Sequence, residues 1–191
     1  MRDFALFAFV PATFLLLAFA MVDWCGGDGI LCRNVLLGLG CGLLAAVAYD
    51  IFRLPFVYSR EWGLTALVPP LPLFKVFPRF GAMLLGQSIE QQHYSAAAQT
   101  LGWIYHFSNG ATFGAMYMAL IGNPSKRAWE WGVALALGIE IGMLLSPYAE
   151  FFKIVIGGAF LFATISAHAI FGATLGAACK GFTRMLRIQR V

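Results

Sequence analysis

Three ionisable side chains of this 191-residue chain lie inside long uncharged stretches: His106, Glu140 and His168. Glu140 falls in the apolar stretch 128–147, and an ionised side chain at the centre of a membrane helix costs about 2.5–3.5 kcal/mol. The Glu140 carboxyl must therefore be protonated, paired or hydrated, and an imidazole beside it would create a site that exchanges a proton. The structural alternative is a neutral glutamic acid that is hydrogen-bonded to a neighbouring helix.

The two histidines begin the same pattern, HxxxGATxGA, at residues 106–115 and 168–177. One apolar stretch separates the copies, so they run in the same direction, and a duplication would place both imidazoles at similar depth. Steps of four residues put each histidine on one helix face with two glycines, Gly110 and Gly114 or Gly172 and Gly176. These glycines either leave a groove beside the imidazole or form ordinary surfaces for close helix packing.

Three functional hypotheses follow from these residues. In a small secondary transporter or proton-linked translocator, Glu140 exchanges the proton and other polar side chains line the path, namely His106, His168, Asn109, Gln99 and Tyr117. In a cofactor-binding membrane subunit, His106 and His168 ligate a haem b or, together with Glu140, a transition metal. A non-catalytic assembly or lipid-interacting subunit of a membrane complex needs no site. The sequence holds no motif of familiar hydrolases or nucleotide-driven pumps, so no enzyme class is indicated.

Composition decides the class of protein. Hydrophobic residues make up 60% of the chain and charged residues 12%, against roughly 45–50% and about 25% in ordinary soluble domains. A soluble domain, a disordered chain and a nucleic-acid-binding module are excluded, because each needs more polar residues. The net charge of +4 comes from basic residues between and after the apolar stretches, where they orient membrane helices. We therefore expect an all-α, polytopic integral membrane bundle that forms one domain over residues 1–191.

Five long membrane helices are predicted, with a Pro-rich segment that either crosses a sixth time or is re-entrant. The expected spans are 4–22, 34–52, 62–86 (irregular or re-entrant), 95–121, 128–147 and 157–179. In the second span, Gly38, Gly42 and Ala46 stand at steps of four and favour close helix packing. The same face ends at Asp50, whose spacing from Arg53 predicts a local ion pair.

The basic amphipathic tail, residues 180–191, is expected to lie on the anionic headgroups of the cytoplasmic leaflet. Six crossings of a bacterial inner membrane would put both termini in the cytoplasm, whereas five would leave the N-terminus outside. Six crossings also place Cys25 and Cys32 on the oxidising side, where they can form a disulfide. Besides lipids, the partners considered are further copies of this chain or a larger membrane complex.

Overall fold

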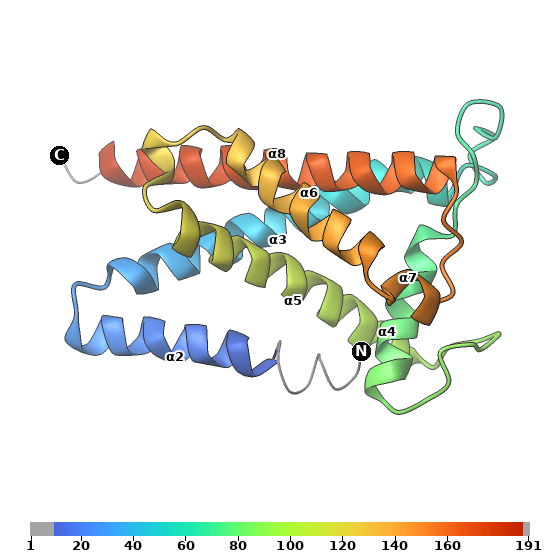
Figure 1. The fold of residues 1–191 in the computed structure, drawn as a ribbon, viewed down its shortest axis with the longest axis horizontal. Helices are drawn as coiled ribbons and strands as arrows, with labels where there is room; N and C mark the ends of the chain where they lie inside the picture. Colours follow the sequence, from blue (N-terminus) through green and yellow to red (C-terminus); the bar gives the residue numbers. More distant parts are fainter. Residues whose placement is uncertain (1–9, 189–191) are drawn as a thin grey trace.

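The computed structural model describes residues 10–188, and this part of the chain is entirely helical (Figure 1). These residues form seven α-helices and two short 3-10 helices, and no β-strand. The α-helices are α2 (Val10–Gly26), α3 (Ile30–Val57), α4 (Val76–Leu84), α5 (Ala96–Ile121), α6 (Glu130–Leu145), α7 (Tyr148–Phe151) and α8 (Gly158–Ile188). The 3-10 helices are η2 (Leu73–Lys75) and η3 (Pro124–Lys126). The all-helical class predicted from the sequence is confirmed.

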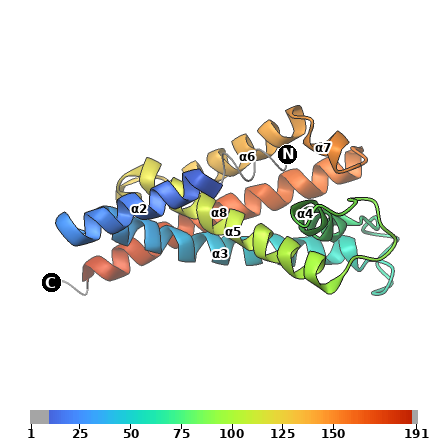
Figure 2. The same cartoon turned by 90° about the horizontal axis from the view of Figure 1, so that it is seen from below.

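The five longer helices, α2, α3, α5, α6 and α8, run along the long axis of the molecule in alternating directions (Figures 1 and 2). α5 packs on α3, and α6 packs on α8, so the bundle contains two antiparallel helix pairs. The pairs meet where α3 contacts α8, and α2 contacts α3. A core of small and aromatic side chains from α3, α5, α6 and α8 fills the space where the pairs meet.

Helix α5 begins where its sequence predicts. Ser95 stands just before the first helical residue, and its hydroxyl oxygen accepts the backbone N–H of Ala98 at 3.2 Å. This N-cap satisfies one of the amide groups that have no partner at the start of a helix. α3 is longer than its predicted span and contains Pro55 in its last turn.

The Pro-rich segment does not run the length of the bundle. α3 ends and α5 begins at the same end of the molecule, and α4 lies across that end between them (Figure 1). α3 ends at Val57, and Pro69, Pro70 and Pro72 lie in the non-helical stretch before η2, where proline lacks the backbone N–H that a helix needs. α4 is held closely against α5, since a Cβ atom at Gly81 would overlap the backbone of Ala98. The Pro-rich segment therefore turns back at this end of the molecule, as the second of the two predicted alternatives requires, and does not run to the other end.

Because this segment turns back, α2 and α8 run in the same direction (Figure 1). The chain therefore enters the bundle from the side opposite to the one at which α8 ends. The predicted six crossings, with both termini on one side, would require residues 54–92 to run once from one end of the bundle to the other. Because this segment begins and ends at the same end of the molecule, that prediction is corrected. Of the first expected span, 4–22, residues 4–9 lie outside the described part of the chain, as do residues 189–191 of the tail.

As far as residue 188, the predicted tail is part of α8 and does not form a separate element. α8 continues without a break from Gly158 to Ile188, and Lys180 and Arg184 belong to it. The sequence between residues 180 and 188 contains no proline, and its Arg, Met and Leu residues favour helix continuation.

Cys25 and Cys32 stand on either side of the turn between α2 and α3, and both thiols are free. Asp23 closes this turn instead, because its carboxylate accepts the backbone N–H of Cys32 at 3.1 Å. Gly29, at φ 67°, allows the sharp entry into α3. The predicted disulfide is therefore not formed in this structure.

Two helices are long and apolar enough to cross a membrane: α3 over Ile30–Val57 and α8 over Gly158–Leu186. α2 contributes a shorter apolar helix over Pro11–Gly26. α5 has 26 residues and no charged side chain, but His106 and Asn109 lower its hydropathy. These helices are compatible with a protein of the membrane.

Glycines form the contact line within each helix pair. Between α3 and α5, a Cβ atom at Gly42 would overlap the carbonyl group of Gly110, and one at Gly114 would overlap that of Gly38. Between α6 and α8, a Cβ atom at Gly172 would overlap the backbone of Gly132, and one at Gly176 would overlap that of Trp129. Backbones can approach this closely only where side chains are absent.

We predict that Gly42→Ala lowers the free energy of unfolding by about 1–3 kcal/mol, because the added methyl group forces α3 and α5 apart. The matched control is Gly40→Ala on the same helix, where no atom lies within 4 Å of the added Cβ. The control should leave stability unchanged or raise it by up to about 1 kcal/mol. Thermal unfolding in detergent micelles measures both, and equal effects of the two substitutions would contradict the packing described.

Candidate functional site

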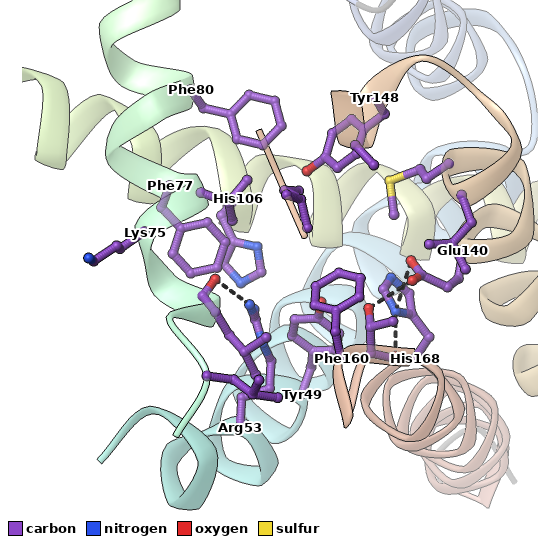
Figure 3. A pocket seen from close by; sticks show the side chains of 18 of the residues that line it. Tyr49, Arg53, Lys75, Phe77, Phe80, His106, Glu140, Tyr148, Phe160 and His168 are labelled. Atoms are coloured by element: carbon purple, nitrogen blue, oxygen red, sulfur yellow. Dashed lines mark hydrogen bonds and ion pairs between the residues drawn. The ribbon is translucent and has the colours of Figure 1, made fainter. Parts of the chain in front are cut away.

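A cavity of about 670 Å³ opens between the helix pairs, and residues of α4 and α7 are part of its lining (Figure 3). Residues of α3, α4, α5, α6, α7, α8 and the loop before α8 line it. Its volume lies within the roughly 300–1,000 Å³ that is typical of small-molecule sites. His106, Glu140 and His168 are all part of the wall, so the structure brings the three predicted residues to one place.

His106 of α5 is held by Asp50 of α3. Nε2 of His106 lies 2.8 Å from Oδ2 of Asp50, and the two side chains are 14% and 13% exposed. The ring of Phe77 from α4 stacks on the imidazole, with 4.3 Å between the ring centroids. A carboxylate in apolar surroundings needs such a partner, because burying an unpaired charge is costly.

Arg53 completes this cluster. Its Nη1 lies 3.5 Å from Oδ1 of Asp50, and its Nη2 donates a hydrogen bond of 2.6 Å to the carbonyl oxygen of Leu73. The guanidinium carbon lies 4.8–5.3 Å from the ring centroids of Tyr49, Phe74 and Phe77, within cation–π distance. Arg53 is only 5% exposed, and these contacts join α3 to the segment that leads into α4.

Glu140 of α6 and His168 of α8 form the second pair. Nδ1 of His168 lies 3.3 Å from Oε2 of Glu140 and 2.9 Å from the carbonyl oxygen of Thr164. Because a carbonyl oxygen only accepts, Nδ1 carries a hydrogen and donates it. Thr164 Oγ1 donates a hydrogen bond of 2.8 Å to Oε1 of Glu140, which fixes the carboxyl group. Nε2 is therefore the ring nitrogen of His168 that can gain or lose a proton.

Tyr49 of α3 stands between the two histidines. The centroid of its ring lies 5.9 Å from that of His106 and 5.0 Å from that of His168, which it meets edge-on at 75°. Its hydroxyl group also interacts with the hydroxyl of Thr164. Tyr49 therefore connects the two histidine and carboxylate pairs, although no sequence pattern singles it out.

Two further polar side chains line the cavity. Asn109 lies one turn after His106 on α5, and its Oδ1 is buried with no hydrogen-bond partner among the described residues. Tyr148 of α7 directs its hydroxyl group into the cavity (Figure 3). Burial raises the pKa of Tyr148 well above its usual value, so the phenol stays protonated at neutral pH.

Gln99 and Tyr117, which the sequence analysis placed on the same path, do not line the cavity. Gln99 lies in the first turn of α5, where its Nε2 donates a hydrogen bond of 3.1 Å to the carbonyl oxygen of Tyr94. Tyr117 is buried in the core beside Cys179. It is eleven residues from His106 (117 − 106), so the two lie about 16 Å apart along the helix.

The geometry around His106 and His168 does not fit a haem or a metal. Two axial ligands must direct their nitrogens at one iron. Here the ring of Tyr49 lies between the imidazoles, and each imidazole contacts a carboxylate of its own. No group of three or more His, Cys, Asp and Glu side chains within residues 10–188 could hold a metal ion.

Asp50 is the partner that the sequence analysis missed, because its spacing from Arg53 predicts only a local ion pair. The sequence nevertheless contains a spacing that indicates this partner. Asp50 stands eight residues after Gly42, and Glu140 stands eight residues after Gly132. Since both glycines lie on the contact line of their helix pair, both carboxylates point toward the histidine helix opposite.

No family model, curated protein or solved structure matches this chain. Its site is therefore interpreted from its own geometry.

We predict that Asp50 and His106 are energetically coupled. Asp50→Asn and His106→Gln should each lower the free energy of unfolding, and the double variant should lose about 1–3 kcal/mol less than the sum. Unfolding in detergent micelles measures the three values. As a control, Asp50→Asn combined with His93→Gln should show no coupling, because His93 is exposed in the loop before α5. Strict additivity for Asp50 and His106 would contradict their pairing.

Proposed function

We propose that this protein is a small membrane transporter in which proton exchange at buried histidine and carboxylate pairs is coupled to the passage of a substrate. The observation that carries the proposal is that both histidines, each paired with a carboxylate from another helix, line one cavity. Ionisable side chains inside membrane proteins mark proton and substrate pathways, because their burial is otherwise unfavourable.

The outer surface of the bundle supports its placement in a membrane. Large apolar side chains are exposed on all five longer helices, by 58–84% in the following examples: Phe14, Leu36, Ile104, Leu145 and Phe162. Soluble proteins rarely expose apolar side chains over so much of their surface, whereas lipid solvates them. In this proposal α2, α3, α5, α6 and α8 cross the bilayer, and the segment with α4 is re-entrant.

The second pair is suited to exchange a proton with the cavity. When Nε2 of His168 takes up a proton, the imidazolium charge is offset by the carboxylate of Glu140, which lies 3.3 Å from Nδ1. The hydroxyl of Thr164 keeps that carboxylate oriented while the charge changes. The pair of Asp50 and His106 provides a second such site, with Arg53 as an additional partner of its carboxylate.

In this proposal, the two helix pairs are the units that move relative to each other. Each pair is joined along its glycines and by its own contact between a carboxylate and a histidine, so each can move as a unit. The cavity lies between them. Transporters built from two similar halves change access by rocking one half against the other around a central site. The matching HxxxGATxGA patterns of α5 and α8 agree with such halves.

Purified protein in liposomes with an imposed pH gradient provides the functional test. We predict that Glu140→Gln lowers substrate-linked proton flux at least about tenfold while the protein stays folded, because glutamine keeps the shape but cannot offset the positive charge of a protonated His168. Glu130→Gln is the matched control on the same helix, since Glu130 is exposed in the first turn of α6. Wild-type flux in Glu140→Gln would remove this carboxyl from the mechanism.

Five crossings also define an orientation. The turn between α2 and α3, η3 and the end of α8 lie at one end of the bundle (Figure 1). Lys126, Arg127, Lys180 and Arg184 stand at this end, which we assign to the cytoplasm by the positive-inside rule. The opposite end, with α4 and α7, then faces outward. Cys25 and Cys32 would lie in a reducing compartment, in agreement with their free thiols.

Cysteine labelling in intact cells tests this orientation. A membrane-impermeant maleimide should label Ser88→Cys in the exposed loop between α4 and α5. It should label the exposed Cys25 only after the membrane is permeabilised. Labelling of both positions from the same side would contradict five crossings.

A further inference from the structure

The charges that line the cavity are unbalanced. Among the described residues, four basic side chains line it, Arg53, Lys75, Arg79 and Lys153, but only one acidic side chain, Glu140. Glu140 is occupied by His168 and Thr164. The ammonium group of Lys75 points away from the cavity (Figure 3). Arg53, Arg79 and Lys153 are therefore the basic lining residues that remain to be considered.

Two of these cations have no acidic partner. Arg53 is paired with Asp50, but neither Arg79 nor Lys153 forms an ion pair with any described residue. They belong to segments far apart in the sequence, and a hydrogen bond from Arg79 to the carbonyl oxygen of Phe152 joins these segments. Because Lys153 directly follows Phe152 and both Arg79 and Lys153 line the cavity, the two residues lie at one part of the wall.

The backbone at Lys153 is unusual. Its φ of 51° is the only positive φ of a non-glycine residue in the described part of the chain. The N–H of Ile154 bonds the carbonyl oxygen of Ala149 at 2.8 Å, so Lys153 occupies the left-handed position after a short helix that glycine normally takes. A lysine is strained there, and residues held in strained conformations concentrate at functional sites.

Most of the other residues in the wall are apolar. Aromatic and aliphatic side chains from α4, α6 and α8 face the cavity, including Phe80, Ile139, Met143, Leu144 and Phe160. Such a surface gains little from binding a small hydrated anion, but it takes apolar groups out of water favourably.

We propose that the cavity binds an anionic amphiphile, whose phosphate or carboxylate group is held by Arg79 and Lys153 and whose apolar body lies along the aromatic and aliphatic wall. Guanidinium and ammonium groups are the common ligands of such anions, and Arg79 offers further N–H groups besides the one bonded to Phe152. The inference rests on the proposed function, because it names the substrate of the same cavity. A proton held at Glu140 and His168 would offset the negative charge that the substrate carries through the membrane.

Equilibrium dialysis of the protein in phosphatidylcholine nanodiscs, with empty nanodiscs subtracted, tests the proposal with radiolabelled dodecyl phosphate. Saturable binding is expected, with inorganic phosphate at least about 100-fold weaker and dodecanol at least about tenfold weaker. Inorganic phosphate that binds as tightly would show a site for a free anion and overturn the amphiphile. Dodecanol that binds as tightly would show that the cations take no part and would also overturn it.

Two substitutions test the residues. Arg79→Gln should weaken dodecyl phosphate binding at least about tenfold. Lys153→Gly should weaken it similarly while raising the melting temperature, because glycine relieves the left-handed strain; this variant remains informative if Arg79→Gln folds poorly. Lys126→Gln, at the opposite end of the bundle, is the control and should bind like the wild type. Unchanged affinity in Lys153→Gly would overturn the assigned headgroup site.

The two proposals can fail separately. Proton-linked flux is tested by Glu140→Gln, whereas dodecyl phosphate binding is tested by Arg79→Gln and Lys153→Gly, so each proposal has a readout of its own. Absence of binding in a protein that still moves protons would refute the anionic amphiphile alone. Binding without any dependence of transport on Glu140 would refute the proton coupling alone.

Discussion

A carboxylate inside an apolar helical bundle must be paired, and this requirement constrains the packing of the whole molecule. Asp50 and Glu140 each meet a histidine from the neighbouring antiparallel helix. An imidazole is short, so the helix backbones must approach closely, and the glycines eight residues before each carboxylate permit this. If the contact line were lost, a buried charge would be left without its partner, at a cost of about 3–5 kcal/mol.

Much of the architecture could be predicted from the sequence. Long uncharged stretches predict helices, Ser95 marks the start of α5, and polar residues inside such stretches stand out because few other reasons place them there. The same patterns could not show which way the Pro-rich segment turns, since prolines end a helix without giving the chain a new direction. Nor could they separate Asn109, in the cavity wall, from Tyr117, about two turns away in the core. The spacing of residues shows which face of a helix they share, but it does not show which neighbouring helix that face contacts.

The cavity combines features that the sequence keeps far apart. Arg79 and Lys153 are 74 residues apart (153 − 79), yet both line the cavity, and the contact between Arg79 and the Phe152 carbonyl joins their segments. The pair of Glu140 and His168, at which we propose proton exchange, lies in the same cavity. Cationic groups without acidic partners, apolar walls and a buried titratable pair are the features on which our proposal of a negatively charged, partly apolar substrate rests.

The proton exchange at His168 is tested most directly by nitrogen-15 magnetic resonance of histidine-labelled protein in bilayers, between about pH 5 and 8. His168→Gln assigns the resonances. We predict that Nδ1 stays protonated throughout, because it donates to the Thr164 carbonyl, while Nε2 changes from protonated to deprotonated as the pH rises. An Nε2 resonance that does not change over this range would contradict the proton exchange.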